Sequence, residues 1–440
     1  MPLLKNPISL AQSQTKISRR RAIRRMAGVS GVAAAPLVLP ARVFGAAAPS
    51  KQITLGFVGL GNEGYGHNLK AMLVEKDARV VAVCDVMASR RTRARETVEK
   101  QYSATGCKEI ADFRDLIARK DIDAVVISTP DHWHVPISLM ALEAGKDVFC
   151  EKPTLTIAEG RTLVETVARH KAVFQVGLED RSVIYYYRMA ELVRNGAIGQ
   201  LQTIHVKLPA GWAFPLEKPA PVPADLNWDM WLGPAPFHPF TPTRADSKHW
   251  RQVRDYSGGE LTDWGAHIID TAQVANFAER SGPVEVEGTG EIPPNSMATI
   301  FTTFKLHYRY ANGVEMFVES GGVAIRFDGT DGWIGNNGWR GGLEGTSKEL
   351  LRRKYPREGN KIWPMPPSEH RNFLDCVKSR QPTTYTAEAG QRLSTAMHIG
   401  NIAMELGRKL KWDPQSESFP GDEAANALCS RPARNDWMKR

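Results

Sequence analysis

Asp263 and His267, in the middle of the chain, have side-chain types and a spacing that suit proton transfer. They lie four residues apart in a segment that we expect to be helical, so the two side chains share a face at about 5 to 6 Å. A carboxylate beside an imidazole can orient the ring and favour its charged form. The same spacing is also common in salt bridges at helix ends, so the pair alone does not identify a reaction.

A glycine-rich turn follows the first apolar run of the chain. Gly59, Gly61 and Gly64 form the pattern G-x-G-x-x-G between a β-rich run and a helical segment. In that setting the pattern is typical of a dinucleotide-binding turn: the glycines allow a tight turn, a close approach to the pyrophosphate and close helix packing. The helix N-terminus then attracts the phosphates. We assign these glycines, together with Asn62, to a predicted cofactor site.

A carboxylate stands where such a site would hold the adenosine ribose. Asp85 ends the second predicted strand, 21 residues beyond Gly64. An acid at this place accepts hydrogen bonds from the ribose hydroxyls and repels a 2′-phosphate, which favours NAD over NADP. Arg90 and Arg91 lie nearby and keep NADP open as the less favoured cofactor.

Two further polar segments follow the fourth and fifth predicted strands, residues 128–134 and 151–153. Ligands of parallel sheets bind beyond the carboxyl ends of the strands, so both segments should face the nicotinamide. The additional predicted cofactor-binding residues are Ser128, Thr129, Pro130, His134, Glu151 and Lys152. His132 and His134 could also be a metal pair, but no third ligand is in sequence reach. We expect them to cap the following helix or line a pocket, and we predict no metal site.

The elements that must position these residues alternate between β-rich and helical runs from residue 51 onward. This rhythm indicates a parallel sheet with crossover helices. The predicted strands are 53–58, 80–84, 124–128, 147–150 and 173–176. The predicted helices are 68–74, 89–101, 113–119, 136–144 and 157–169. Residues 51–178 are therefore expected to form a doubly wound α/β domain.

The pattern changes after residue 178. A predicted helix at 187–194 leads to a strand at 201–207, and residues 209–242 then hold nine of the 28 prolines. Such a long excursion is often a lid or a binding loop. Residues 284–327 have the period-two pattern of several strands, and residues 371–410 return to helix. We predict that residues 179–440 form an α+β domain with C-terminal helices, which binds the substrate and mediates self-association.

Five tryptophans crowd the region between the proline-rich excursion and the Asp263 segment: Trp212, Trp228, Trp231, Trp250 and Trp264. Indole rings pack well against the apolar faces of sugar rings. Ordinary core packing explains at least half of them equally well.

The charge of the chain is concentrated at its start. The 440 residues include 57 Lys and Arg against 48 Asp and Glu, and residues 1–50 hold eight of the basic residues and no acid. The rest is close to neutral, which argues against a nucleic-acid-binding protein. The five cysteines are far apart and form no C-x-x-C, so they indicate neither a disulfide framework nor a zinc site.

The basic leader contains Arg19, Arg20 and Arg21, then a short apolar run, then three alanines at 46–48. It resembles a twin-arginine export signal, although Ala22 stands where Phe is usual; a basic tail without a signal function is the alternative. We expect residues 1–48 to be a signal peptide read by the twin-arginine export machinery, and the protein to be periplasmic. The apolar run is too short and too rich in Gly and Ala for stable membrane insertion.

Taken together, residues 59–64, the Glu151-Lys152-Pro153 tripeptide and residues 258–270 resemble the glucose-fructose oxidoreductase, inositol dehydrogenase and rhizopine-catabolism (Gfo/Idh/MocA) family. The resemblance runs from about residue 53 to residue 412. It implies a Rossmann domain followed by an α+β domain with an open, mainly antiparallel sheet. It also implies sugars or cyclitols as substrates and assembly into a homo-oligomer.

The resemblance further implies that Lys152, Asp263 and His267 are catalytic. In that reading His267 takes the proton of a substrate hydroxyl and Lys152 stabilises the developing alkoxide. Asp263 would hold His267 in place or bind a neighbouring hydroxyl. The bond between Lys152 and Pro153 is expected to be cis.

Three functions follow from the sequence. The first is an oxidoreductase acting on a secondary hydroxyl of a sugar or cyclitol, with NAD bound tightly because free NAD is scarce outside the cytoplasm. The second is a glycoside hydrolase that oxidises, eliminates, hydrates and reduces its substrate with the same NAD. The third is a noncatalytic sugar-binding protein that keeps NAD as a structural group, against which the intact catalytic residues argue.

Overall fold

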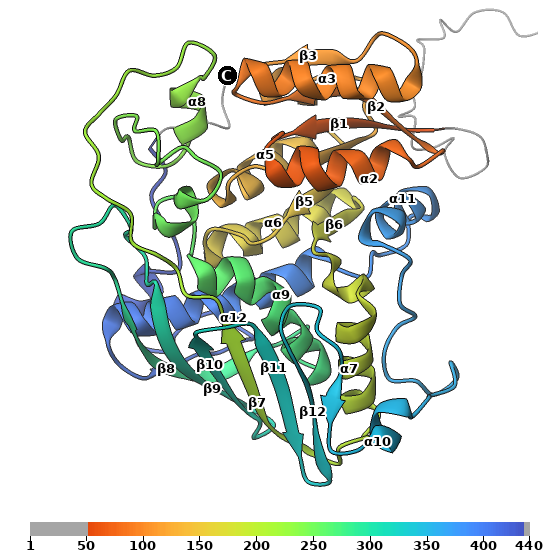
Figure 1. The fold of residues 1–440 in the computed structure, drawn as a ribbon, viewed down its shortest axis with the longest axis vertical. Coiled ribbons are helices and arrows are strands. Elements are labelled where there is room, and N and C mark those ends of the chain that lie inside the picture. The colour runs from red at the N-terminus through yellow and green to blue at the C-terminus, as the bar shows by residue number, and fades with distance from the viewer. Residues whose placement is uncertain (1–51, 435–440) are drawn as a thin grey trace, which may run out of the picture. The chain divides into compact units, whose positions relative to one another are not determined.

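The computed structural model of the chain describes residues 52–434 (Figure 1). The predicted signal peptide lies outside the described residues. Between residues 52 and 434, no helix combines the length and the apolar character needed to span a bilayer.

The first third of the described chain forms a six-stranded, all-parallel sheet with the order β3-β2-β1-β4-β5-β6. Its strands are β1 (Ile53–Val58), β2 (Ala78–Cys84), β3 (Lys108–Ile110), β4 (Ala124–Ile127), β5 (Asp147–Glu151) and β6 (Phe174–Gly177). The central strands β1 and β4 are apolar and almost entirely buried, as a sheet with both faces covered requires. The predicted doubly wound Rossmann fold is confirmed.

Helices cover both faces of this sheet: η2 (Gly64–Leu69, a π-helical turn), α2 (Lys70–Leu73), α3 (Ala88–Tyr102), α4 (Phe113–Ile117), α5 (Asp131–Glu143) and α6 (Ile157–His170). Five strands match predicted segments. Strand β3 was not predicted, because its three residues, Lys-Glu-Ile, include two exposed charges and no apolar run. The first helix was predicted too late in the sequence, since the helical turns begin at Asn62, inside the glycine pattern.

The rest of the described chain contains an eight-stranded sheet with the order β13-β12-β11-β7-β10-β9-β8-β14. The strands are β7 (Leu201–Leu208), β8 (Pro283–Glu291), β9 (Thr303–Tyr310), β10 (Glu315–Ser320), β11 (Ala324–Gly329), β12 (Gly332–Asn337), β13 (Glu344–Gly345) and β14 (Leu410–Lys411). Only the β7–β10 pairing is parallel within this sheet of described residues. The expected open, mainly antiparallel sheet is therefore confirmed.

Three helices cover one face of the second sheet: α7 (Ile184–Arg194), α9 (Glu260–Ala275) and α12 (Ala387–Leu406) (Figure 1). Alternate residues of β9 are buried beneath them, and those between face solvent or are only partly buried. Helix α12 packs against α6 of the first third as well as against α9. It thus fixes the edge of the first sheet relative to α9. The shorter helices are η3 (Glu179–Ser182), α8 (Trp228–Leu232), η4 (His249–Gln252), α10 (Lys348–Arg352), α11 (Glu369–Ser379) and α13 (Glu423–Ala427).

Residues 209–256, which we name the roof segment, run from β7 back to the first sheet and include α8 and η4. They have a small core of their own, with Trp228, Trp231, Phe240 and Trp250 buried together. The segment is hydrogen-bonded to the chain just after β2: Asn227 N donates to Val86 O at 3.0 Å, and Ala88 N donates to Asp225 O at 2.9 Å. In Figure 1, α8 accordingly lies beside the α3 end of the first sheet.

Candidate active site

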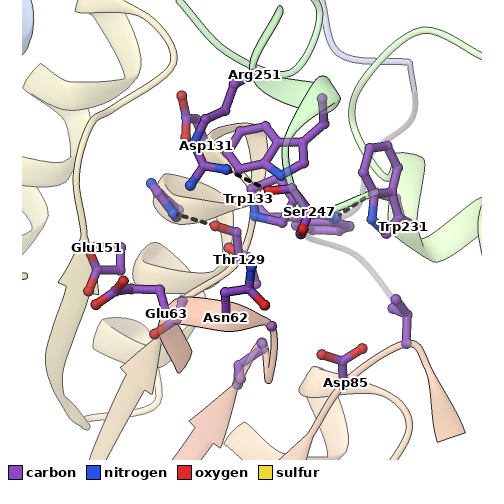
Figure 2. Close-up of a pocket in the computed structure, with 18 of the residues that line it drawn as sticks. Asn62, Glu63, Asp85, Thr129, Asp131, Trp133, Glu151, Trp231, Ser247 and Arg251 are labelled. Atoms are coloured by element: carbon purple, nitrogen blue, oxygen red, sulfur yellow. Dashed lines mark hydrogen bonds between the residues drawn. The ribbon is translucent and has the colours of Figure 1, made fainter. Parts of the chain in front are cut away.

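A cavity of about 310 Å³ opens at the carboxyl edge of the six-stranded sheet. Its wall combines the glycine turn, the ends of β2, β4 and β5, the first turns of α9 and part of the roof segment. In Figure 2, Asp85 lies toward one end and Glu63 and Glu151 toward the other, with Asn62 and Thr129 between them. Every predicted site residue except Gly64 lines this cavity.

The glycine turn has the geometry that a dinucleotide requires. Gly59 has a φ of +87°, and a Cβ there would lie 2.4 Å from the carbonyl oxygen of Ser128. Gly64 lies behind the turn, where a Cβ would come within 2.0 Å of the carbonyl oxygen of Gly59. At Gly61, by contrast, the nearest atom would be 3.7 Å away, on the flexible Arg90 side chain. The backbone is thus open to a ligand at Gly61 and closely packed behind it.

Asp85 ends β2 beside this turn and is buried. Its Oδ2 accepts a hydrogen bond from Leu60 N at 2.7 Å, and its Oδ1 accepts one from Met87 N at 2.9 Å. The carboxylate therefore connects the glycine turn to the residues just after β2, to which the roof segment is hydrogen-bonded. Arg90 also lines the cavity, with Nη1 at 3.9 Å from Asp85 Oδ2. The acid and the arginine are both at the end of the cavity predicted for the adenosine ribose.

The loop after β4 leads directly into α5, so the two histidines lie in the first turn of a helix. Nδ1 of His134 is 2.7 Å from Pro153 O, and its Nε2 is 2.8 Å from Thr129 O, so the ring joins the loops after β4 and β5. His132 Nε2 is 2.9 Å from Trp231 O in the roof segment. Each ring is thus engaged with backbone carbonyls, and the two do not converge on a common point.

Lys152 and Asp263 meet across the cavity. Nζ of Lys152 donates to Asp263 Oδ1 at 2.7 Å and to the Asp263 carbonyl at 3.0 Å. The other oxygen, Oδ2, pairs with Nε of Arg251 at 3.0 Å. Burial acts to raise the pKa of Asp263, but Arg251 and Lys152 outweigh it and hold that pKa well below its usual value. Burial acts to lower the pKa of Lys152, but Asp263 outweighs it and the net pKa is raised. Both groups remain charged.

His267 is oriented by a different carboxylate from the one expected. Its Nδ1 lies 2.6 Å from Oδ2 of Asp180, a buried residue of η3. Asp263 is instead paired with Lys152 at one of its oxygens and with Arg251 at the other. A carboxylate only accepts hydrogen bonds, so the ring hydrogen is on Nδ1 and the lone pair on Nε2. His267 lines the cavity and is thereby prepared to accept a proton.

Two indole rings flank this histidine. The ring centroids of Trp264 and Trp339 lie 5.8 and 5.9 Å from that of His267, and 5.5 Å from each other. Trp339, in the loop after β12, is partly exposed, and the neighbouring Arg340 pairs with Glu179 at 2.6 Å. The cavity thus has apolar ring faces and charged hydrogen-bonding groups at the same end. Of the tryptophans singled out in the sequence, Trp231, Trp250 and Trp264 line it.

Three functional residues had escaped the sequence analysis: Asp180, Arg251 and Trp339. Asp180 directly follows β6, so the rule that points to the loops after β4 and β5 would also have found it. Arg251 lies in the four-residue helix η4 and Trp339 in a turn, and neither periodicity nor a motif marks such short elements. The Lys152–Pro153 bond is cis, as expected.

Two family models match the chain. Residues 53–178 match the oxidoreductase family, NAD-binding Rossmann fold, and residues 189–439 match the oxidoreductase family, C-terminal alpha/beta domain. The chain belongs to the Gfo/Idh/MocA family. The resemblance seen in the three motifs is therefore confirmed, and residues 53–178 of this Gfo/Idh/MocA protein form an NAD-binding domain.

Curated relatives of this Gfo/Idh/MocA protein match it over one part only. Inositol 2-dehydrogenase of Salmonella typhimurium is 33% identical over 152 residues, which is 34% of this chain and 44% of that protein. Glycosyl hydrolase family 109 protein 1 of Shewanella sp. (strain ANA-3) is 33% identical over 186 residues, or 40% of this chain and 39% of that protein. The chain thus spans less than half the length of these relatives.

Solved structures share the fold over most of the chain. Levoglucosan dehydrogenase in complex with NADH and levoglucosan has a TM-score of 0.61 at 19% identity, covering 82% of this chain and 99% of that one. Aldose-aldose oxidoreductase from Caulobacter crescentus, complexed with glycerol, has a TM-score of 0.61 at 18% identity, covering 82% and 100%. At such identities the likeness establishes the fold alone.

Proposed function

We propose that this protein oxidises a secondary hydroxyl of a sugar or cyclitol and transfers the hydride to bound NAD. One observation carries the proposal: a lysine held in its charged form and a histidine with a free Nε2 line the same cavity as the glycine turn. A hydroxyl placed between them would meet a cation for its oxygen and an acceptor for its proton.

In this mechanism His267 takes the hydroxyl proton on Nε2, while Asp180 stabilises the imidazolium that forms. Lys152 stabilises the negative charge on the substrate oxygen, and Asp263 with Arg251 keeps the lysine in place. Bound NAD would supply the hydride acceptor, and because it stays bound, a second carbonyl compound would reoxidise it in place. Trp264 and Trp339 would pack against the apolar face of the substrate ring, which supports a sugar or cyclitol over a short-chain alcohol.

The cavity residues fit the dinucleotide: Gly61 leaves the backbone open, and Asp85 stands at the ribose end. We favour NAD over NADP because of this carboxylate. Asp85→Ala is expected to weaken NAD retention or relax the preference against NADP, since it also frees the amides of Leu60 and Met87. Nucleotide released on denaturation and the affinities for both cofactors measure this. An unaltered cofactor profile would remove Asp85 from the ribose site.

The roof segment supports tight retention of NAD. It contributes Trp231, Ser247 and Trp250 to the cavity wall and is hydrogen-bonded to the chain on either side of Met87. The C-terminal stretch holds it in turn, because Arg434 pairs with Asp229 at 2.7 Å and Arg434 N donates to Pro234 O at 2.8 Å. These contacts would restrain a nucleotide that is bound beneath the segment.

The decisive experiment assays the nucleotide released from the purified, denatured protein. The native protein is then incubated with a panel of sugars, cyclitols and glycosides while the absorbance of bound NADH is followed. Reduction of bound NAD by a free sugar or cyclitol supports the proposal. No spectral change and no cleavage with any compound would favour a noncatalytic binder instead.

A glycoside hydrolase is the second candidate, because one curated relative carries a glycosyl hydrolase name. The same lysine and histidine could assist the oxidation of a glycoside by bound NAD. Elimination, hydration and reduction by the NADH formed would then release the sugar without net NADH. Cleavage of nitrophenyl glycosides with no lasting change in bound-NADH absorbance would select this reaction over net oxidation.

We further propose that the protein is exported to the periplasm by the twin-arginine route, as the leader sequence indicates. Replacing Arg19 and Arg20 together by lysine is expected to leave the protein in the cytoplasm. Cell fractionation of the wild type and the double variant tests this. Equal periplasmic amounts of both would argue for a different route.

A further inference from the structure

A group of side chains of the types that bind metal ions lies next to the cavity and takes no part in the reaction proposed above. It consists of His67, on η2 behind the glycine turn, and of Glu369 and His370, in the first turn of α11. One ligand atom from each of the three lies within 4.8 Å of the others. The fold thus brings together two segments about 300 residues apart in the sequence.

The spacing suits a first-row divalent ion. Nε2 of His67 lies 3.4 Å from Glu369 Oε1, and Nδ1 of His370 lies 3.9 Å from the same oxygen. Ligands about 2.0 to 2.1 Å from a tetrahedral zinc ion are about 3.3 Å apart, so small side-chain shifts would close the site. In the other acid–histidine cluster, Asp180 and His267 are only 2.6 Å apart, which is hydrogen-bond geometry.

The hydrogen bonds around His370 leave its Nδ1 free to bind an ion. Nε2 of the ring lies 2.7 Å from Oδ1 of Asn68, which accepts only, so the ring hydrogen is on Nε2. The Asn68 amide is oriented in turn, because its Nδ2 donates to Glu151 Oε1 at 2.8 Å and to Ser128 Oγ at 3.0 Å. Metal-binding histidines typically have the outer nitrogen fixed in this way.

Glu369 offers a buried oxygen with no partner. The residue is 4% exposed, and its Oε2 makes no hydrogen bond among the described residues. The negative charges of Glu63 and Glu179 repel the carboxylate of Glu369. Those of Glu63 and Glu369 in turn repel the carboxylate of Glu151. Among the described residues, the basic side chains found within 4.0 Å of Glu369 are the two histidines. A divalent cation would offset this local excess of carboxylates.

We propose that His67, Glu369 and His370 bind one divalent transition-metal ion of the zinc class. Two imidazoles and one carboxylate are a donor set that zinc accepts, with the fourth position open to water. His67 is half-exposed while the other two are buried, so an ion would enter past His67. Through Asn68 the site is joined to Glu151 in the cavity wall. It replaces the expectation of no metal site and does not depend on the proposed reaction.

The test measures zinc binding by the full chain, purified without a polyhistidine tag and stripped with a chelator. We expect one Zn²⁺ per chain to survive dialysis, and Mg²⁺, which prefers oxygen ligands, not to displace it. His67→Ala and Glu369→Gln are each expected to lower the zinc affinity by about 100-fold or more, because even outer partners contribute about 10- to 100-fold. His205→Ala, on the open face of the second sheet, is the matched control and should bind zinc like the wild type.

Nucleotide content is measured in each variant, so that loss of zinc with normal NAD excludes misfolding. Glu369→Gln, nearly isosteric, serves if His67→Ala is unstable. Absence of stoichiometric zinc in the wild type overturns the proposal, as does zinc affinity that is unchanged in both variants. Zinc lost with His267→Asn but kept with His67→Ala would place the ion in the other cluster and equally overturn it.

Discussion

The candidate active site contains two pairs of an acidic and a basic side chain, and the two pairs differ in their hydrogen bonding. Asp263 is bonded to two cations, and its partner Lys152 has two acceptors on one Nζ, so the charge of that pair is fixed. Asp180 bonds one imidazole, and its Oδ1 has no hydrogen-bond partner in the described chain. The first pair is built to hold a charge in place. The second leaves one nitrogen of His267 free to gain and lose a proton.

Removing the proton acceptor tests the second pair and should have the largest effect. His267→Asn is expected to lower kcat by about 10²- to 10⁴-fold, the usual contribution of a general base. The bound nucleotide should remain, because His267 is not part of the glycine turn. Added imidazole should restore part of the turnover of His267→Ala. Wild-type turnover in His267→Asn would exclude it as the base.

Removing the fixed charge tests the first pair. Lys152→Ala is expected to lower kcat by about 10²- to 10³-fold with nucleotide content near normal, because its charge acts mainly in the transition state. Steady-state kinetics and released NAD measure both quantities. Lys207→Ala, an exposed lysine on β7, is the control and should match the wild type. Unchanged turnover in Lys152→Ala would remove the lysine from the mechanism.

The two carboxylates should separate in their pH profiles. Asp180→Asn is expected to lower kcat by about 10- to 100-fold with little change in KM, since it acts by orienting His267. Asp263→Asn leaves Lys152 buried without its counter-charge, so burial then lowers the lysine pKa and the alkaline limb of kcat moves to lower pH. Asp180→Asn should leave that limb in place. Identical profiles for the two variants would contradict the distinction.

A third buried carboxylate gives a smaller, purely energetic effect. Burial raises the pKa of Asp131 from 3.8 to about 7, with Asp263 adding to the rise. The folded state therefore binds more protons than the unfolded state between these values, and the free energy of unfolding falls as pH rises through this window.

Asp131→Asn, neutral at every pH, should raise Tm by about 2 to 4 °C at pH 8 and show no gain at pH 4. Thermal unfolding at the two pH values measures this. Asp331→Asn, at an exposed position, should shift Tm by less than 1 °C at both. A gain that is equal at pH 4 and pH 8 would show that ionisation is not the cause.

Much of the site could be predicted because it lies in short contiguous motifs. Gly59, Gly61 and Asp85 occupy positions that are set within one βαβ unit. Lys152 directly follows a strand, and ligands of parallel sheets bind beyond the carboxyl ends of the strands, so its place in the site needs no knowledge of the tertiary structure. The pairing of His267 could not be predicted from helical spacing, because its partner Asp180 is 87 residues away. Arg251, which pairs with Asp263, lies in a helix of only four residues that leaves no periodic signal in the sequence.

The fold followed from periodicity where the elements are long. Strand β3 and the π-helical turn of η2 were not predicted, because three residues or a changed helical pitch leave no periodic signal. The proline-rich run predicted a long excursion of the chain, but not which part of the protein it packs against. Its pairing with the chain after β2 depends on backbone hydrogen bonds, which carry no side-chain signature.

The way in which the roof segment is held has a consequence for the exchange of the bound nucleotide. Two separate stretches of polypeptide, one after β2 and one near the C-terminus, hold it at once. Moving the roof segment away from the cavity would break both sets of contacts, which costs more free energy than the swing of a loop held at one place. We would then expect each copy of the protein to keep the dinucleotide that it bound on folding. New nucleotide would be taken up only as fast as new copies of the protein are synthesised.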